Sequence, residues 1–267
     1  MKTYKEHYEK SRKLSGVKSD PNSKYSSLYD ISIDTDFLDT DSEYDRLVRV
    51  VSEKIRHKLD NEPESCHEAR FVTYVNKWRD IPEIYELTDL IMPQIEKKVF
   101  HSKLKIEFVL PYRNKVTDID LTASWLWHYD DAPAEFLKLA IYLNDTTENN
   151  GCFQYISEKE GAPVIASSRI KPGPATQQVF PGSRIPKKVI TELLSRGADI
   201  TSLVGPAGTY ALFTPNIIHR ATMPDPTLPP REALFFFIRP SIEQGSFIDE
   251  STNSILPSKD VKRYKLD

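Results

Sequence analysis

The stretch Leu104-Lys105-Ile106-Glu107-Phe108-Val109-Leu110 decides the fold class, because apolar residues recur here at every second position. Side chains two residues apart project from the same face of a strand, so this alternation predicts a strand. Further short strands, separated by proline-rich turns, are expected at 123–130, 136–143, 209–214 and 232–238. The second half of the chain is therefore predicted to be mostly β-structure.

Helices are expected mainly before residue 100. The apolar residues of 41–59 recur at three- and four-residue spacing, and Asp41 or Ser42 can cap the start of that helix. A second helix is predicted over about 83–99, bent or split at Pro93. One more is expected within the strand region at about 186–196. Helices followed by many strands predict an α+β chain with a β-barrel or jelly-roll core.

The predicted organisation is a single structural domain in four parts. These are a polar N-terminal arm that is expected to be loose or to hold one short helix, a helical flank packed on the barrel, a catalytic core and a C-terminal tail, at 1–30, 31–100, 101–245 and 246–267.

Composition excludes several classes of protein. The chain has 267 residues, of which 39% are hydrophobic and 28% charged, as in an ordinary globular protein. Its net charge of −3 argues against a general nucleic-acid binder, and it has no apolar run long enough for a membrane span. Its two cysteines, Cys66 and Cys152, and the lack of a secretory signal favour a cytoplasmic location.

The candidate chemistry begins at Ser124-Trp125-Leu126-Trp127-His128-Tyr129-Asp130. In a strand, His128 and Asp130 would project together and supply two ligands of a facial triad, which needs a second histidine. Of the six histidines, only His219 lies after residue 128. The alternative is a structural ion pair without a metal, because histidine and aspartate two apart are common.

Three other polar residues are candidates for cofactor binding. Arg231 follows His219 by twelve residues, and a guanidinium at the mouth of an apolar barrel needs an anionic partner, such as a dicarboxylate. An exposed ion pair is the alternative, and Arg239 on the same strand is the competitor. Lys138 could bind co-substrate or substrate, or extend to solvent. Asn216 could hydrogen-bond near the metal or form a turn.

These residues together resemble a known family. His128-x-Asp130, the stretch from Leu139 to Gly151 ending in a polar turn, Gly208 to Phe213, His219 and Arg231 look like the phytanoyl-CoA dioxygenase-like group of iron(II)/2-oxoglutarate oxygenases. The similarity covers roughly 100–240. The chain departs from the family pattern after Gly151, because the family's Pro-Gly-Ser-His loop is matched only by Pro181-Gly182-Ser183-Arg184.

The resemblance implies a double-stranded β-helix with N-terminal helices packed on one side. It implies iron ligation by His128, Asp130 and His219, and 2-oxoglutarate held by Arg231. The expected reaction is hydroxylation, or another oxidation, of a small or carrier-bound substrate with dioxygen, releasing succinate and carbon dioxide. Halogenating members lack the carboxylate that Asp130 supplies here.

Two other functions stay open on the sequence. One is a cupin-like metal enzyme that does not use 2-oxoglutarate, and the other is a non-catalytic jelly roll that binds a ligand. Neither a nucleic acid nor a membrane is an expected partner.

Overall fold

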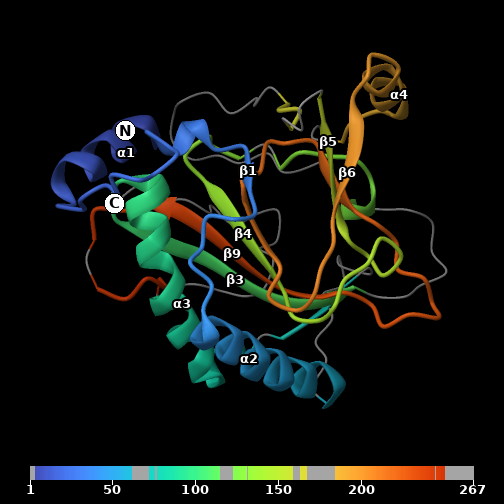
Figure 1. Cartoon of the computed structure of the whole chain (residues 1–267), viewed down its shortest axis with the longest axis horizontal. Helices are drawn as coiled ribbons and strands as arrows, with labels where there is room; N and C mark the ends of the chain where they lie inside the picture. The colour runs from blue at the N-terminus through green and yellow to red at the C-terminus, as the bar shows by residue number, and fades with distance from the viewer. Residues whose placement is uncertain are drawn as a thin grey trace, which may run out of the picture.

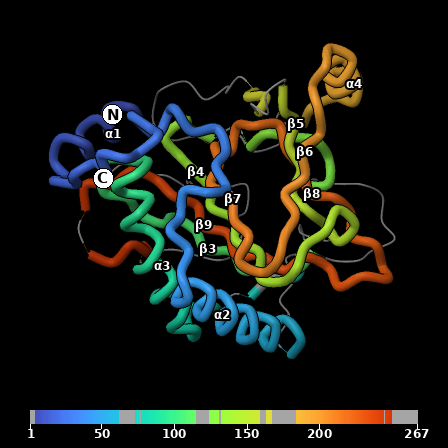
Figure 2. Tube along the Cα trace, in the orientation of Figure 1, coloured from blue at the N-terminus to red at the C-terminus, as the bar shows by residue number. Residues whose placement is uncertain are grey.

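The computed structural model describes two antiparallel sheets. The described residues are 4–61, 72–75, 77–114, 123–130, 132–158, 163–166, 184–243 and 245–249. Within them, the larger sheet has the strand order β1-β7-β4-β9-β3-β2, and the smaller has the order β6-β5-β8. Figures 1 and 2 show β5, β6 and β8 on one side of the molecule and the larger sheet on the other.

The strand bounds are as follows. The larger sheet contains β1 Ile33–Asp34, β2 Val72–Tyr74, β3 Leu104–Asn114, β4 Leu137–Tyr142, β7 Tyr210–Phe213 and β9 Glu232–Pro240. The smaller sheet contains β5 Phe153–Ser157, β6 Asp199–Leu203 and β8 His219–Ala221. The strands predicted at 104–110, 136–143, 209–214 and 232–238 are therefore present as β3, β4, β7 and β9.

The helices are α1 Tyr4–Leu14, α2 Ser42–Asn61, α3 Pro82–Ile95 and α4 Lys187–Ser195. As predicted, Asp41 caps α2, because its Oδ1 accepts hydrogen bonds from the backbone of Glu43 at 3.0 Å and of Tyr44 at 2.9 Å. Pro93 does not split α3, which passes through it and then continues as a π-helical turn over Glu96–Phe100. Short 3₁₀ turns occupy Leu28–Asp30, Lys77–Asp80 and Ala123–Trp125.

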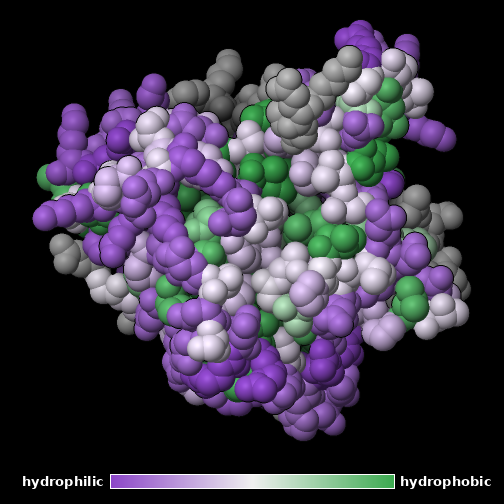
Figure 3. Space-filling view, viewed as in Figure 1, coloured by the Kyte–Doolittle hydropathy of each residue, from purple (hydrophilic) through white to green (hydrophobic). Residues whose placement is uncertain are grey.

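The two faces of the larger sheet have different partners. Leu139, Ile141 and Leu212 project outward into a core shared with α2 and α3, which cover that face in Figure 1. Their neighbours Ala140 and Tyr142 project inward, into a second core shared with Phe153 of the smaller sheet. This alternation makes the inward face the interior of a barrel. Figure 3 shows that the solvent-facing surface of α2 is polar.

Several predictions differ from the structure. The arm holds one short helix, α1, and this helix is packed on the rest of the chain, because Tyr8 is fully buried and its hydroxyl donates to the Phe100 carbonyl at 2.8 Å. Tyr4 of α1 also packs edge-on against Phe136, with ring centroids 5.3 Å apart. The larger sheet starts before residue 101, since it includes β1 and β2. Residues 123–130 form a turn and isolated bridges instead of a strand.

The chain has no helix, among the described residues, that is long and apolar enough to cross a membrane. Cys152 is buried and free, whereas Cys66 lies outside the described residues, as does the tail beyond residue 249.

Candidate metal centre

The backbone brings the two predicted histidine ligands opposite each other. His128 N donates to His219 O at 3.0 Å, and His219 N donates to His128 O at 2.8 Å. Asp130 N donates to Pro215 O at 2.9 Å, which is a further backbone contact between the two segments. His128 and Asp130 are thus held by the β8 segment and not by a strand of their own.

The three side chains converge on one point. One ligand atom from each of His128, Asp130 and His219 lies within 4.8 Å of the other two. Asp130 Oδ1 is 3.7 Å from His128 Nε2, and Asp130 Oδ2 is 3.6 Å from His219 Nε2. Metal–ligand bonds of about 2.1 Å at right angles put neighbouring ligand atoms about 3 Å apart. The three groups therefore fit one ion after small side-chain shifts.

Hydrogen bonds orient both imidazoles. His128 Nδ1 contacts Leu126 O at 2.8 Å, and His219 Nδ1 contacts Ile217 O at 2.8 Å. A carbonyl only accepts, so each Nδ1 carries the proton and each Nε2 keeps its lone pair. This is the arrangement that metal-binding histidines usually have.

The protonation states of the three side chains suit the binding of a cation. Burial lowers the pKa of His128 and of His219, so both imidazoles stay neutral. Burial alone would raise the pKa of Asp130, but the charge of Lys138 holds that pKa below its usual range. Two neutral imidazoles and one carboxylate with an open side are the donor set of non-haem iron(II) sites.

Lys138 points into the barrel. On β4 it is flanked by Phe213 of β7 and Phe237 of β9, and its ammonium lies 4.6 Å from the Phe237 ring centre. The ammonium forms an ion pair with Asp130 Oδ2. With 13% of its side chain exposed, Lys138 does not extend to solvent, which excludes one of the two sequence interpretations.

Arg231 is a buried cation with donors to spare. It is 2% exposed, and its guanidinium lies 5.5 Å and 5.7 Å from the ring centres of Tyr112 and Tyr142. Its Nη2 donates to Tyr112 Oη at 2.6 Å and to Asn114 Oδ1 at 3.5 Å. Nε and Nη1 have no hydrogen-bond partner among the described residues. A bidentate carboxylate would satisfy such a guanidinium.

The competitor Arg239 lies at the other end of β9 and is paired with Glu107 and Asp249. Its guanidinium therefore already has anionic partners, unlike that of Arg231 in the described part of the chain.

The polar turn after β4 holds the start of β9. Asn144 Oδ1 accepts from Glu232 N at 2.8 Å, and its Nδ2 donates to Pro230 O at 3.1 Å. Asn150 O accepts from Arg231 N at 2.8 Å. The sequence singled out this turn as a motif, but its role as a clamp on Arg231 is visible only in the structure.

The side-chain amide of Asn216, predicted to bind a cofactor, bonds to the backbone of Ala132. Its Nδ2 donates to Ala132 O at 2.8 Å, and its Oδ1 accepts from Ala132 N at 3.1 Å. Through these two bonds Asn216 fixes the loop that follows Asp130.

Sequence reasoning missed Tyr112, Tyr142, Asn114 and Arg184. Arg184 forms a backbone bridge with His128. Burial is the main cause of the lowered pKa of His128 and His219, and the positive charge of Arg184 adds to it. Arg184 occupies the position of the histidine in the family's Pro-Gly-Ser-His loop. This correspondence was the one signal in the sequence that pointed to Arg184.

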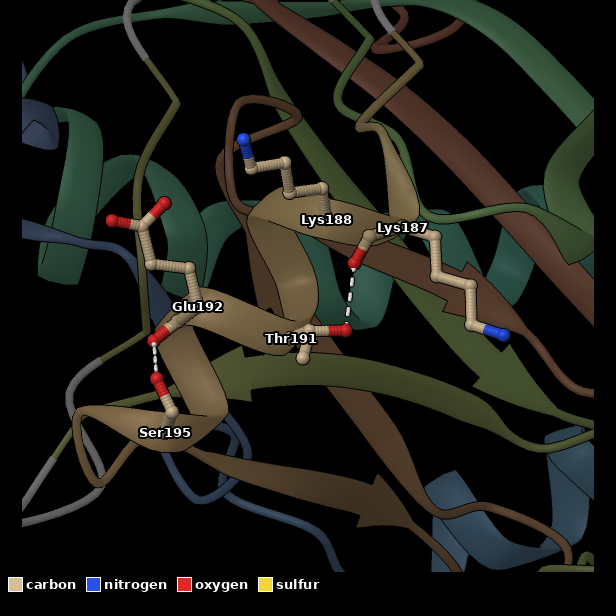
Figure 4. Close-up of a pocket in the computed structure, with 5 residues that line it drawn as sticks. All are labelled: Lys187, Lys188, Thr191, Glu192 and Ser195. Atoms are coloured by element: carbon tan, nitrogen blue, oxygen red, sulfur yellow. Dashed lines mark hydrogen bonds between the residues drawn. The ribbon is translucent and has the colours of Figure 1, made fainter.

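A surface pocket on α4 lies elsewhere and offers little chemistry. It is lined by Lys187, Lys188, Thr191, Glu192 and Ser195, shown in Figure 4. The hydroxyls of Thr191 and Ser195 already donate to carbonyls of the same helix.

Comparison with known proteins gives the following. No family model matches the chain. An L-proline trans-4-hydroxylase from Streptomyces griseoviridis is 28% identical over 115 residues, which are 38% of this chain and 42% of that protein. The chain thus matches less than half of that relative's length.

Solved structures of EctD from S. alaskensis cover most of the chain. With 2-oxoglutarate and 5-hydroxyectoine, EctD has a TM-score of 0.53 at 14% identity, over 94% of this chain and 90% of that one. Its apo form has a TM-score of 0.51 at 14% identity, over 88% of each chain. The fold is a double-stranded β-helix. The fold prediction is confirmed, and the resemblance to iron(II)/2-oxoglutarate oxygenases agrees with these comparisons.

Proposed function

We propose that the chain is an iron(II)/2-oxoglutarate-dependent oxygenase that hydroxylates a small molecule. The observation that carries this proposal is Arg231, a buried guanidinium with two nitrogens left over, on the same barrel interior as a histidine–aspartate–histidine cluster. A metal enzyme without a dicarboxylate co-substrate gives such an arginine nothing to bind, and an unpaired buried charge is expensive.

Each residue has a defined task in this proposal. His128, Asp130 and His219 would hold the iron, and the carbonyls of Leu126 and Ile217 fix the orientation of the two imidazoles. Arg231 would hold the distal carboxylate of 2-oxoglutarate. When bound, the iron and co-substrate supply, with dioxygen, the oxidising power, and succinate and carbon dioxide are the products.

Small side chains line the barrel interior near these groups. Ala140 of β4 lies opposite Ala211 of β7, and Ala233 of β9 lies opposite Tyr142. All three alanines belong to the inward-facing core, and Ala140 is the residue between Lys138 and Tyr142 on this face of β4. Aromatic rings of Phe153 and Phe213 border His219, with ring centres 5.3 Å and 5.7 Å away, and help to exclude water.

Hydroxylation of a small molecule is favoured by the partial match to an L-proline trans-4-hydroxylase. The substrate would be a small molecule, free or bound to a carrier, and the predicted cytoplasmic location stays a prediction.

The test is an anaerobic titration with Fe(II) and then 2-oxoglutarate, followed by the charge-transfer absorption of the chelate. We expect His128→Ala and Asp130→Ala to abolish the absorption and the formation of succinate. Arg231→Met should weaken 2-oxoglutarate binding at least about tenfold, because a charge-assisted bidentate contact is lost. Arg239→Met removes a paired arginine from the same strand and should leave that affinity unchanged. Equal affinities in the two arginine variants would contradict the proposal.

A further inference from the structure

Lys138 is a buried cation that the proposed function does not use. Its single carboxylate partner among the described residues is Asp130, a predicted metal ligand. Two other cations on the larger sheet have carboxylate partners that are not predicted metal ligands. Lys105 contacts Ser246 O at 2.6 Å and Glu243 at 3.6 Å, and Arg239 pairs with Glu107 and Asp249.

Lys138 and Arg231 lie at different ends of the barrel interior. Lys138 and Tyr142 occupy the same face of β4, four residues apart, which corresponds to about 13 Å along a strand. The Arg231 guanidinium lies against Tyr142, whereas the Lys138 ammonium lies against Phe237 and Asp130. The distal carboxylate held by Arg231 is therefore out of reach of Lys138, which leaves the ammonium as a second cationic group beside the predicted metal site.

Metal binding changes what Lys138 needs. A divalent ion on Asp130 takes up most of the charge of that carboxylate, which weakens its attraction for the ammonium. Lys138 is then a desolvated cation between Phe213 and Phe237, and a buried charge requires an anionic partner. Arg184, bridged to His128, adds positive charge at the same end.

We propose that Lys138 binds a carboxylate of the substrate, so that the substrate of this site is a small carboxylic acid. The inference rests on the proposed function, since it is metal binding that frees Lys138. The Phe237 ring beneath the ammonium and the neighbouring Phe213 then border the apolar part of the same substrate.

The experiment uses protein loaded with Ni(II) and 2-oxoglutarate, which binds but does not turn over. Amino acids and N-acetyl amino acids, each paired with its own primary amide, are titrated calorimetrically. We expect wild type to bind at least one acid about tenfold more tightly than its amide, as for one charge-assisted contact. Lys138→Met should lose this preference, and Lys138→Arg should keep part of it. Lys105→Met is the matched control and should behave as wild type.

Three results would overturn the inference alone. The first is an absence of any acid preference in wild type that forms the metal–2-oxoglutarate absorption. The second is a preference that survives Lys138→Met. The third is a Lys138→Met variant that loses metal or 2-oxoglutarate affinity instead, which assigns Lys138 to positioning Asp130 or to the co-substrate. A wild type without chelate absorption would overturn the proposed function as well.

Discussion

Replacing Gly151 by alanine tests the clamp on Arg231. Gly151 has φ +98°, a region that residues with a Cβ rarely adopt, and a Cβ there would lie 2.3 Å from Asn114 Nδ2. That amide donates to Gly151 O at 3.1 Å, while Oδ1 of Asn114 contacts Arg231. The substitution thus strains the backbone and displaces the side chain that supports the buried guanidinium.

The magnitude can be worked out from these contacts. Left-handed backbone costs an L-residue about 1–2 kcal/mol. Displacing Asn114 breaks two hydrogen bonds, which adds about 1–3 kcal/mol. We therefore expect Gly151→Ala to lower the free energy of unfolding by about 2–5 kcal/mol in total.

Gly245→Ala is the matched control. Gly245 has φ +104°, nearly that of Gly151, but a Cβ there meets nothing within 4 Å. Gly245→Ala should lower the free energy of unfolding only by the backbone contribution of about 1–2 kcal/mol. Urea unfolding of both variants measures the difference, and the Kd for 2-oxoglutarate should rise in Gly151→Ala alone. Equal destabilisation of the two variants would refute the clamp.

Three further predictions concern other contacts. Tyr112→Phe removes the acceptor of Arg231 Nη2 and should lower the free energy of unfolding by about 1–3 kcal/mol, measured in urea; an unchanged midpoint would contradict the contact. Asn216→Ala releases Ala132 and should weaken Fe(II) binding about tenfold in a competitive titration, whereas unaltered affinity would show that the loop needs no clamp. Burial raises the pKa of Glu96 above its ordinary 4.5, so the folded state holds its proton to higher pH than the unfolded state. The resulting stabilisation is present below about pH 4.5 and is lost as the pH rises through the folded-state pKa. Glu96→Gln should therefore flatten the fall in unfolding free energy above about pH 4.5, and parallel curves for the two proteins would exclude this role.

The longest apolar patterns in the sequence were enough to predict their elements. The spacing of Leu47, Val51 and Ile55 predicted α2, and all three are buried. The strands β5, β6 and β8, with the sequences FQYIS, DITSL and HRA, were missed because they are short and mix polar with apolar residues, unlike the wholly apolar β7. Such short strands are defined by their partners, which a single sequence does not give.

The sequence predicted the three residues of the cluster but not the contacts that support them. His128, Asp130 and His219 were found from residue type and order, and the structure brings them together. The predicted strand over 123–130 was wrong, because single backbone bridges position the residues there. The contacts of Arg231 with Tyr112 and Asn114 span 119 and 117 residues, and no local pattern signals partners at such a separation.

The packing of α1 has a consequence for how the chain folds. Tyr8 of α1 bonds to Phe100 O, 92 residues later, and Ser11 to Ser241 O, 230 residues later. During synthesis this helix emerges before all the described strands, yet its bond to Ser241 O forms only after β9 has emerged. Contacts at such separation form slowly, because a long loop must close before they stabilise anything. We expect α1 to dock in the final folding step. Since Tyr4 packs against Phe136, that step also buries the segment that joins Asp130 to Lys138.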